Sequence, residues 1–300
     1  MFAHQAALRV ELQLPSGCAD AQGTAGAEAA ADAAVDTALA IDLDLAWRPV
    51  QAQTLGLEPM LRRLQIVDVA LVASREGDFA AALPLWDAVI ERAPQDAAAW
   101  SNRGNVRLAL GDAEAAIADQ TRSMELDPEN PDPHLNRGTA EEALQRWDAA
   151  EADYRWILER DAEADHPPDA SALYNLGNVM GSRGDWTAAR SSFTAASDAR
   201  PGFAMARSSA ALAAFQLGDL DAAETELRRL IRRYPLFADA RAALTALLWR
   251  RGASGEAESH WASASGLDPR YRQPEWLLEI RRWPPEPVSA LNDFLALAVR

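Results

Sequence analysis

A turn-forming residue recurs at a nearly constant interval in this 300-residue sequence, and the interval constrains the fold more than any other feature. The spacings are 34, 34, 39, 34 and 34 residues, through Gly77, Gly111, Gln145, Gly184, Gly218 and Gly252. Proline keeps the same period at Pro94, Pro128, Pro201, Pro235 and Pro269, with Ala162 where a further proline would fall. Such a period is typical of arrays in which one helical supersecondary unit is repeated and stacked.

A second series pairs an alanine with a larger residue four positions later. The alanines are Ala82, Ala116, Ala150, Ala189, Ala223 and Ala257, and the larger residues are Trp86, Gln120, Tyr154, Phe193, Leu227 and Trp261. Residues four apart share one helix face, so the alanine lets two helices approach while the larger side chain fills the space between hairpins. The glycines favour a left-handed turn between the helices, and proline ends the second helix. Four aspartates after the turns are typical N-caps: Asp78, Asp112, Asp185 and Asp219.

This pattern resembles the tetratricopeptide repeat, whose consensus is W-x₂-L-G-x₂-Y, then A-x₃-F, then P. The match includes Trp100 with Gly104, and Leu176-Gly177 followed by Phe193. The departures are Gln145 for Gly, Ala162 for Pro, and Arg107 or Glu141 where an aromatic residue is usual. The resemblance implies an all-α fold, a right-handed α-α superhelix of six helix hairpins at 63–96, 97–130, 131–164, 170–203, 204–237 and 238–271.

The segments outside the repeats have predictions of their own. Residues 1–62 are Ala-rich, and we expect a partly disordered or helical extension. Residues 272–300 show helical spacing of apolar residues around a Trp283-Pro284-Pro285 break. We expect C-terminal capping helices there, because the last repeat of an array has no neighbour to cover its apolar face. The five additional residues within 163–169 are predicted to be an insertion in a surface loop.

Composition excludes several classes of function. The net charge of −16 argues against sequence-independent binding to nucleic acid, although residues 227–300 carry 12 Arg against 8 acidic residues. All 29 basic residues are Arg, so no site uses a lysine ammonium group. A single cysteine, Cys18, cannot form a disulfide framework, and the four histidines lack metal-ligand spacing. No catalytic motif is present, so we expect no enzyme, no cofactor and no metal.

The first helix of several hairpins repeats an asparagine. In tetratricopeptide arrays this helix lines the concave surface, and Asn102, Asn136 and Asn175 all fall at the sixth position of their repeats. Asn105 and Asn178 lie one turn further along the same face. A side-chain amide can bond both the N–H and the C=O of an extended peptide, regardless of the peptide's side chains. We therefore predict a peptide-binding groove in repeats 2–4. It is flanked by Ser101, Tyr174 and Glu142.

One alternative role for these amides stays open. They can instead bond to the neighbouring repeat and organise the stack. The clamp by which chaperone-binding members of the family hold a terminal carboxylate is not expected, because its basic residues are missing. The positions of its lysines are occupied by Val67, Ser101, Asp132 and Leu135.

The stretch "RRLIRRY" at 228–234 provides a second candidate surface. It places four arginines on one helix face: Arg228, Arg229, Arg232 and Arg233. Such a patch could dock an anionic membrane surface or an acidic partner. Glu224 and Glu226 stand four and three residues before Arg228 and Arg229, so the sequence favours a solvated face of intrahelical ion pairs over a contact site.

The closing segment, residues 267–297, is similar to the tails of tetratricopeptide proteins from cyanobacteria and plastid-bearing algae and plants. This resemblance implies a role in assembling photosynthetic complexes and a plastid location, although the first residues do not read as a plastid address. The sequence thus predicts a soluble, non-catalytic scaffold or assembly factor that binds a partner's peptide or helix in its concave groove. It predicts no nucleic-acid partner and at most peripheral membrane contact.

Overall fold

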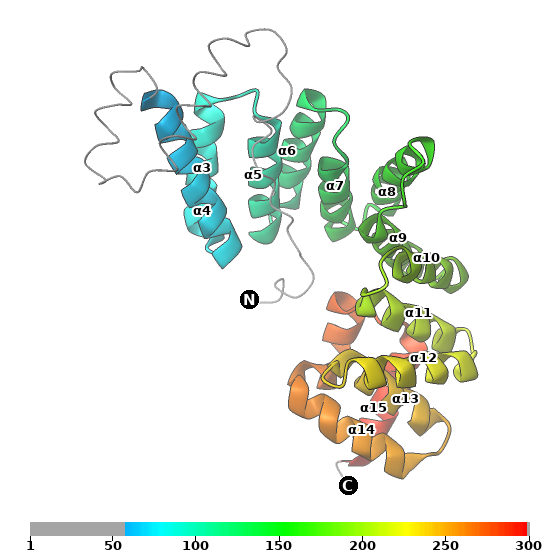
Figure 1. Cartoon of the computed structure of the whole chain (residues 1–300). Helices are drawn as coiled ribbons and strands as arrows, with labels where there is room; N and C mark the ends of the chain where they lie inside the picture. Colours follow the sequence, from blue (N-terminus) through cyan, green and yellow to red (C-terminus); the bar gives the residue numbers. More distant parts are fainter. Residues whose placement is uncertain (1–57, 299–300) are drawn as a thin grey trace. The chain divides into compact units, whose positions relative to one another are not determined.

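The computed structural model describes residues 58–298, which fold into successive helix hairpins (Figure 1). The hairpins are α3 (Glu58–Glu76) with α4 (Phe79–Arg92), α5 (Ala97–Ala109) with α6 (Ala113–Leu126), α7 (Pro131–Ala143) with α8 (Trp147–Glu163), α9 (Ala170–Ser182) with α10 (Trp186–Ala199), α11 (Ala204–Gln216) with α12 (Leu220–Arg233), and α13 (Ala238–Arg250) with α14 (Ser254–Leu267). They are followed by the 3₁₀ turn η1 (Pro269–Arg272), the π-helical turn η2 (Trp276–Ile280) and α15 (Pro285–Ala298). The predicted all-α repeat fold is confirmed, whereas Cys18 and nearly all of the expected N-terminal extension lie outside the described residues.

The helices form two compact bodies, and the chain passes from the first to the second between Asn136 and Arg137 within α7. The core of the first body surrounds Trp86, whose Nε1 donates to Ser74 Oγ at 3.1 Å. The core of the second body runs from α11 through α13 to α15 and includes Leu247 and Leu291, both fully buried. The C-terminal helix is therefore part of the second body's core.

The turns inside the hairpins adopt the left-handed backbone that the period predicts. Gly111 has a φ of 90° and Gly184 a φ of 81°, and the remaining turn glycines resemble them. Gln145 takes the same conformation with a φ of 58°, although it carries a Cβ. The turn geometry is thus kept in repeat 3 at the cost of backbone strain that glycine avoids.

Aspartate caps hold the helix starts. As predicted, Asp78, Asp112, Asp185 and Asp219 each accept a hydrogen bond from the backbone N–H three residues later, at 3.0–3.2 Å. Asp96 and Asp169 cap the first helices of repeats 2 and 4 in the same way, although the period of the turns does not predict these two caps. Each cap satisfies one of the free donors at a helix N-terminus.

Close contact between the two helices of a hairpin explains the small residues. All six alanines of the second series are at most 1% exposed, and the larger residues four positions later are all buried. Gly138 on α7 and Gly177 on α9 lie directly against the rings of Tyr154 and Phe193. A Cβ at either glycine would stand 2.6 Å from the ring. Glycine therefore sets how closely the helices approach in these two repeats.

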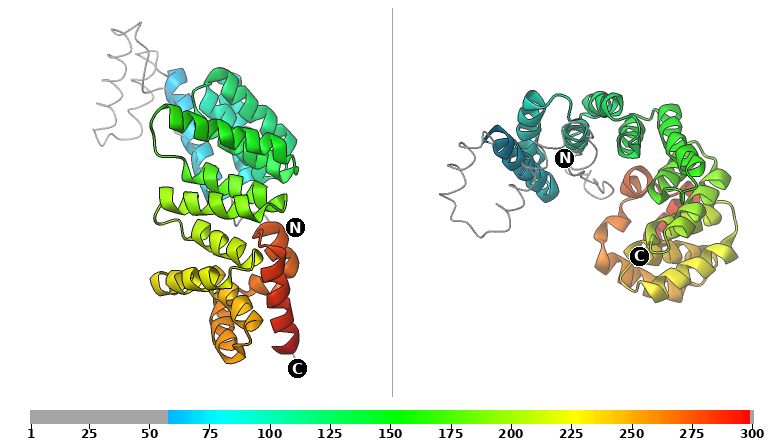
Figure 2. Two further views of the ribbon diagram at one scale, coloured as in Figure 1. Left: turned by 90° about the vertical axis from the view of Figure 1, so that its right-hand side faces the viewer. Right: turned by 45° about the horizontal axis from the view of Figure 1, so that its top comes forward.

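The C-terminal helix packs mainly on the first helices of repeats 5 and 6. Figure 2 shows α15, in red, beside this part of the second body, and its packing partners are α13 and α11. The Glu286 backbone N–H donates to Gln216 Oε1 on α11 at 2.8 Å. The Phe294 ring packs edge-to-face with the rings of Trp249 and Trp261, at centroid distances of 5.7 and 6.0 Å. The segment expected to cap the array thus folds back along the first-helix face of repeats 5 and 6.

Candidate functional site

The predicted amides of the first body are buried or half-buried, and Asn105 Nδ2 is buried without a hydrogen-bond partner within residues 58–298. On α5, Asn102 and Asn105 are 2% and 4% exposed, and Ser101 is fully buried. Gln120 Nε2 donates to Asn105 Oδ1 at 3.0 Å. Asn136 on α7 is half-buried, and its Nδ2 donates to Ser101 Oγ at 3.4 Å. The Asn136 bond joins repeat 3 to repeat 2, whereas the Asn105 bond stays within repeat 2.

The amides of α9, in the second body, are accessible. Ser171, Asn175, Asn178 and Ser182 follow one another at intervals of four, three and four residues, so they form one polar stripe along the helix. Ser171 Oγ accepts from Arg200 Nη2 at 3.0 Å. Within residues 58–298, the half-buried amides of Asn175 and Asn178 have no hydrogen-bond partner. They present donors and acceptors one helical turn apart.

The two predicted flanking residues of the second body serve its own packing. The Tyr174 ring lies 5.4 Å from that of Phe193 and 5.0 Å from that of Phe203, so it anchors α9. Glu142 is 4% exposed and accepts hydrogen bonds from Tyr154 Oη and from Arg282. Burial, together with the Glu142 carboxylate, raises the pKa of the Tyr154 hydroxyl well above its ordinary value.

The same helix face is covered on α11 and α13. The residues of α13 equivalent to the α9 stripe are Asp239, Ala243, Ala246 and Arg250, and the first three are fully buried. Arg250 donates to Glu286 of α15, and Gln216 binds α15 at the same stripe position on α11. The chain's own C-terminal segment therefore occupies the first-helix face of repeats 5 and 6, next to the accessible stripe of repeat 4.

A buried carboxylate fastens this segment. Asp239 accepts hydrogen bonds from Tyr271 Oη at 2.9 Å and Trp283 Nε1 at 3.0 Å. It also accepts from Arg281 Nη2 at 2.7 Å and from Ser208 Oγ on α11. Burial alone would raise the pKa of Asp239, but the Arg281 charge and these hydrogen bonds hold it below its ordinary value. The Arg281 charge and the four hydrogen bonds thus favour the ionised form of this carboxylate.

The four arginines of the predicted basic patch are not equivalent. Arg228 donates to Glu224 at 2.7 Å and to Glu256 at 2.6 Å, and these bonds raise the pKa of its guanidinium. Arg229 approaches Glu226 only to 3.9 Å. Both intrahelical pairs expected from the sequence are thus present. Arg232 and Arg233 are exposed, and neither has an acidic partner within residues 58–298.

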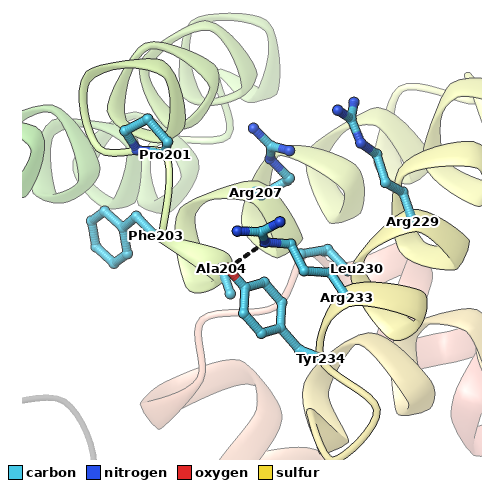
Figure 3. A pocket seen from close by; sticks show the side chains of 8 residues that line it. All are labelled: Pro201, Phe203, Ala204, Arg207, Arg229, Leu230, Arg233 and Tyr234. Atoms are coloured by element: carbon cyan, nitrogen blue, oxygen red, sulfur yellow. Dashed lines mark hydrogen bonds between the residues drawn. The ribbon is translucent and has the colours of Figure 1, made fainter.

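A hollow of about 270 Å³ lies beside Arg229 and Arg233 (Figure 3). Arg207 of α11 contributes a third guanidinium to its lining, and Pro201, Phe203 and Tyr234 supply rings. The sequence did not indicate this pocket, because Arg207 stands 22 positions before Arg229 in another helix. The fold alone brings the three guanidinium groups together.

Comparison with known proteins identifies the family. Residues 68–131, 181–236 and 209–271 match one model of the tetratricopeptide repeat, and residues 132–202 match a second. The chain belongs to the tetratricopeptide repeat family. Proteins of this family mediate protein–protein interaction and bind peptides, and their repeat scaffold is typically non-catalytic. No curated protein matches the whole sequence or any part of it.

Solved tetratricopeptide structures share the fold at low sequence identity. A chain of the APC/C hetero-tetramer Cut9–Hcn1 is 18% identical with a TM-score of 0.61, over 79% of this chain and 43% of its own. Pseudomonas aeruginosa pilF is 16% identical with a TM-score of 0.59, over 71% of this chain and 94% of its own. A tetratricopeptide repeat protein from Parabacteroides merdae is 17% identical with a TM-score of 0.55, over 78% of this chain and 98% of its own. These likenesses concern the fold alone.

Within residues 58–298, no helix has both the length and the hydropathy that a membrane crossing requires.

Proposed function

We propose that this tetratricopeptide protein is a scaffold or assembly factor that holds an extended segment of a partner protein on the first-helix face of repeat 4. One observation carries the proposal. The α9 stripe is accessible and has two unpartnered amides, Asn175 and Asn178, while the same face of α11 and α13 already carries a segment of protein. The chain's own C-terminal segment, which is mainly the helix α15, supports the proposal that a segment of protein can cover this face.

The chemistry of the α9 stripe suits a peptide backbone. Each amide offers two donors and one acceptor oxygen, which match the C=O and N–H groups of an extended chain. A net gain of about 1 kcal/mol per hydrogen bond gives modest affinity, so binding would depend on several contacts acting together. Because the amides are neutral, this part of the interaction would depend little on salt.

Site-specific cross-linking tests the proposal. A photoreactive residue in place of Ser182, at the exposed end of the stripe, should capture a partner from the source lysate. Capture should fall when Asn175 and Asn178 are both changed to Ala. The matched control is Asn292→Ala on α15, which removes an amide away from the α9 face. Equal capture by the double variant and the control would refute binding at this stripe.

The class of partner is a finer proposal. The similarity of residues 267–297 to tails of cyanobacterial and plastid tetratricopeptide proteins supports a role in assembling photosynthetic complexes, within a plastid or a cyanobacterial cell. The identity of the cross-linked partner tests this directly. A partner unrelated to photosynthesis would overturn the assignment while leaving the α9 site intact.

A further inference from the structure

Three arginines from two helices face one pocket at the junction of repeats 4 and 5. Arg207 on α11 and Arg229 and Arg233 on α12 all line this pocket, and Figure 3 shows the three side chains around it. The Phe203 ring borders the pocket from the loop before α11, and Tyr234 borders it from the end of α12.

The positive charge at this pocket exceeds the negative charge that faces it. The residues that line the pocket include no acid. Glu226, which lies nearby, approaches Arg207 to 3.6 Å and Arg229 to 3.9 Å, so one carboxylate serves two guanidiniums without a close hydrogen bond to either. Arg233 Nε donates to Tyr234 Oη at 3.2 Å and has no acidic partner within the described residues.

Most donors of these arginines are therefore available to a ligand. A guanidinium has five N–H donors in a planar fork. Within residues 58–298, Arg207 and Arg229 make no side-chain hydrogen bond, and Arg233 makes the single bond to Tyr234. Like charges that share a concave surface repel one another, and a multivalent anion bound between them would relieve that repulsion.

We propose that this pocket binds the phosphate group of a phosphorylated side chain on a partner protein. A phosphate monoester carries a charge of about −1.5 to −2 and three acceptor oxygens, which fits three convergent guanidiniums better than a carboxylate with one charge and two oxygens. The rings of Phe203 and Tyr234 supply apolar contact for the part of the side chain that bears the phosphate.

An anionic membrane is the weaker occupant for this surface. Electrostatic membrane docking uses clusters of about four to eight basic residues on an open face. Here Arg228 forms ion pairs with Glu224 and Glu256, so the basic cluster at the pocket consists of Arg207, Arg229 and Arg233. The chain's net charge of −16 would also repel an anionic lipid surface as a whole. The residues that line the pocket include none of the α9 stripe, and the two proposals are tested with different variants, so this proposal and the proposed function can fail independently.

Fluorescence anisotropy tests the pocket with defined probes. The probes are labelled peptide pools with randomised flanks and a central phosphoserine or phosphotyrosine, the same pools without phosphate, free inorganic phosphate as competitor, and phosphatidylcholine vesicles containing phosphatidylserine. The variants are Arg207→Gln and Arg233→Gln. Arg232→Gln is the matched control, because Arg232 lies on the same helix and is exposed but does not line the pocket.

The proposal predicts that a phosphorylated pool binds at least about tenfold more tightly than its unphosphorylated twin, since hydrogen bonds between charged groups are the stronger class. Arg207→Gln and Arg233→Gln should each weaken this binding about tenfold, Arg232→Gln less than twofold, and all should melt like the wild type. Equal binding of both pools would overturn the proposal. So would binding of free phosphate without preference for the peptide, or vesicle binding that Arg232→Gln weakens as much as Arg207→Gln.

Discussion

Arg281 of the C-terminal segment donates to Asp239 of α13 at 2.7 Å, across 42 positions of sequence. The Asp239 side chain is 0% exposed and that of Arg281 only 10%. Tyr271 and Trp283 bond to the same carboxylate, so both ends of the segment between α14 and α15 are tied to one buried charge. This cluster holds the C-terminal segment on the first-helix face of repeat 6.

Neutralising that charge should destabilise the second body. Asp239→Asn keeps the shape of the side chain but leaves the Arg281 guanidinium buried without its counter-ion, which typically costs about 3–5 kcal/mol of unfolding free energy. Urea unfolding followed by circular dichroism would measure the loss. Asp221→Asn is the control, because Asp221 also pairs with an arginine but is exposed, and it should change little. Similar losses in both variants would contradict the assigned role of the buried pair.

The same cluster should make stability sensitive to acid. The folded-state pKa of Asp239 lies below its ordinary value of 3.8, so its carboxylate stabilises the folded state above that pH. This contribution should be lost as the pH falls from about 4 toward the lower folded-state pKa. Unfolding free energies measured between about pH 6 and pH 2 should decline less steeply in Asp239→Asn than in the wild type. An identical pH dependence of the unfolding free energy in the two proteins would show that folding does not lower the pKa of Asp239.

The left-handed turn in repeat 3 offers a stabilising substitution. Gln145→Gly should raise the unfolding free energy by about 1 kcal/mol, because glycine adopts a φ near 58° without steric cost. Gly111→Ala tests the reverse change at the equivalent turn, where φ is 90° and no atom stands within 4 Å of the added Cβ. This substitution should lower the unfolding free energy. Thermal melting would compare the two. A destabilised Gln145→Gly would mean that the glutamine side chain stabilises the turn.

Close packing inside a hairpin gives a further prediction. Gly138→Ala would place a Cβ 2.6 Å from the Tyr154 ring, and overpacking of this kind costs about 1–3 kcal/mol. Gly202→Ala is the control, since nothing lies within 4 Å of its added Cβ. Denaturant midpoints should separate the two variants. A neutral Gly138→Ala would show that α7 and α8 can move apart without loss.

The helix hairpins could be predicted from sequence because each marker has a local cause. A left-handed turn needs a residue such as Gly184, an N-cap needs a side chain such as Asp185, and a close helix contact needs a residue as small as Ala189. These requirements act within a few neighbouring residues, so they recur with the repeat and can be recognised in one sequence. Where the rule is broken, at Gln145, the neighbouring helices keep the turn in place.

The accessible surface could not be predicted in the same way. Asn102 and Asn175 occupy equivalent repeat positions, yet Asn102 is only 2% exposed whereas Asn175 is half-buried. The periodic pattern does not encode which neighbour covers a helix face. Arg282 reaches Glu142 across 140 positions, and such long-range pairing has no local signal. The pocket at Arg207 has no signal in the repeat period either, because it depends on which side chains face one another across the α11–α12 hairpin.

The affinity of the cross-linked partner for the α9 stripe is the most direct test of the account. Binding of that partner to the wild type and to the Asn175→Ala, Asn178→Ala double variant would be measured by calorimetry at low and high salt. Binding should be at least about tenfold weaker in the double variant, while the melting temperatures stay equal. The difference in binding free energy between the two proteins should depend little on salt, because the amides are neutral. Unchanged affinity in the double variant, with folding intact, would contradict it.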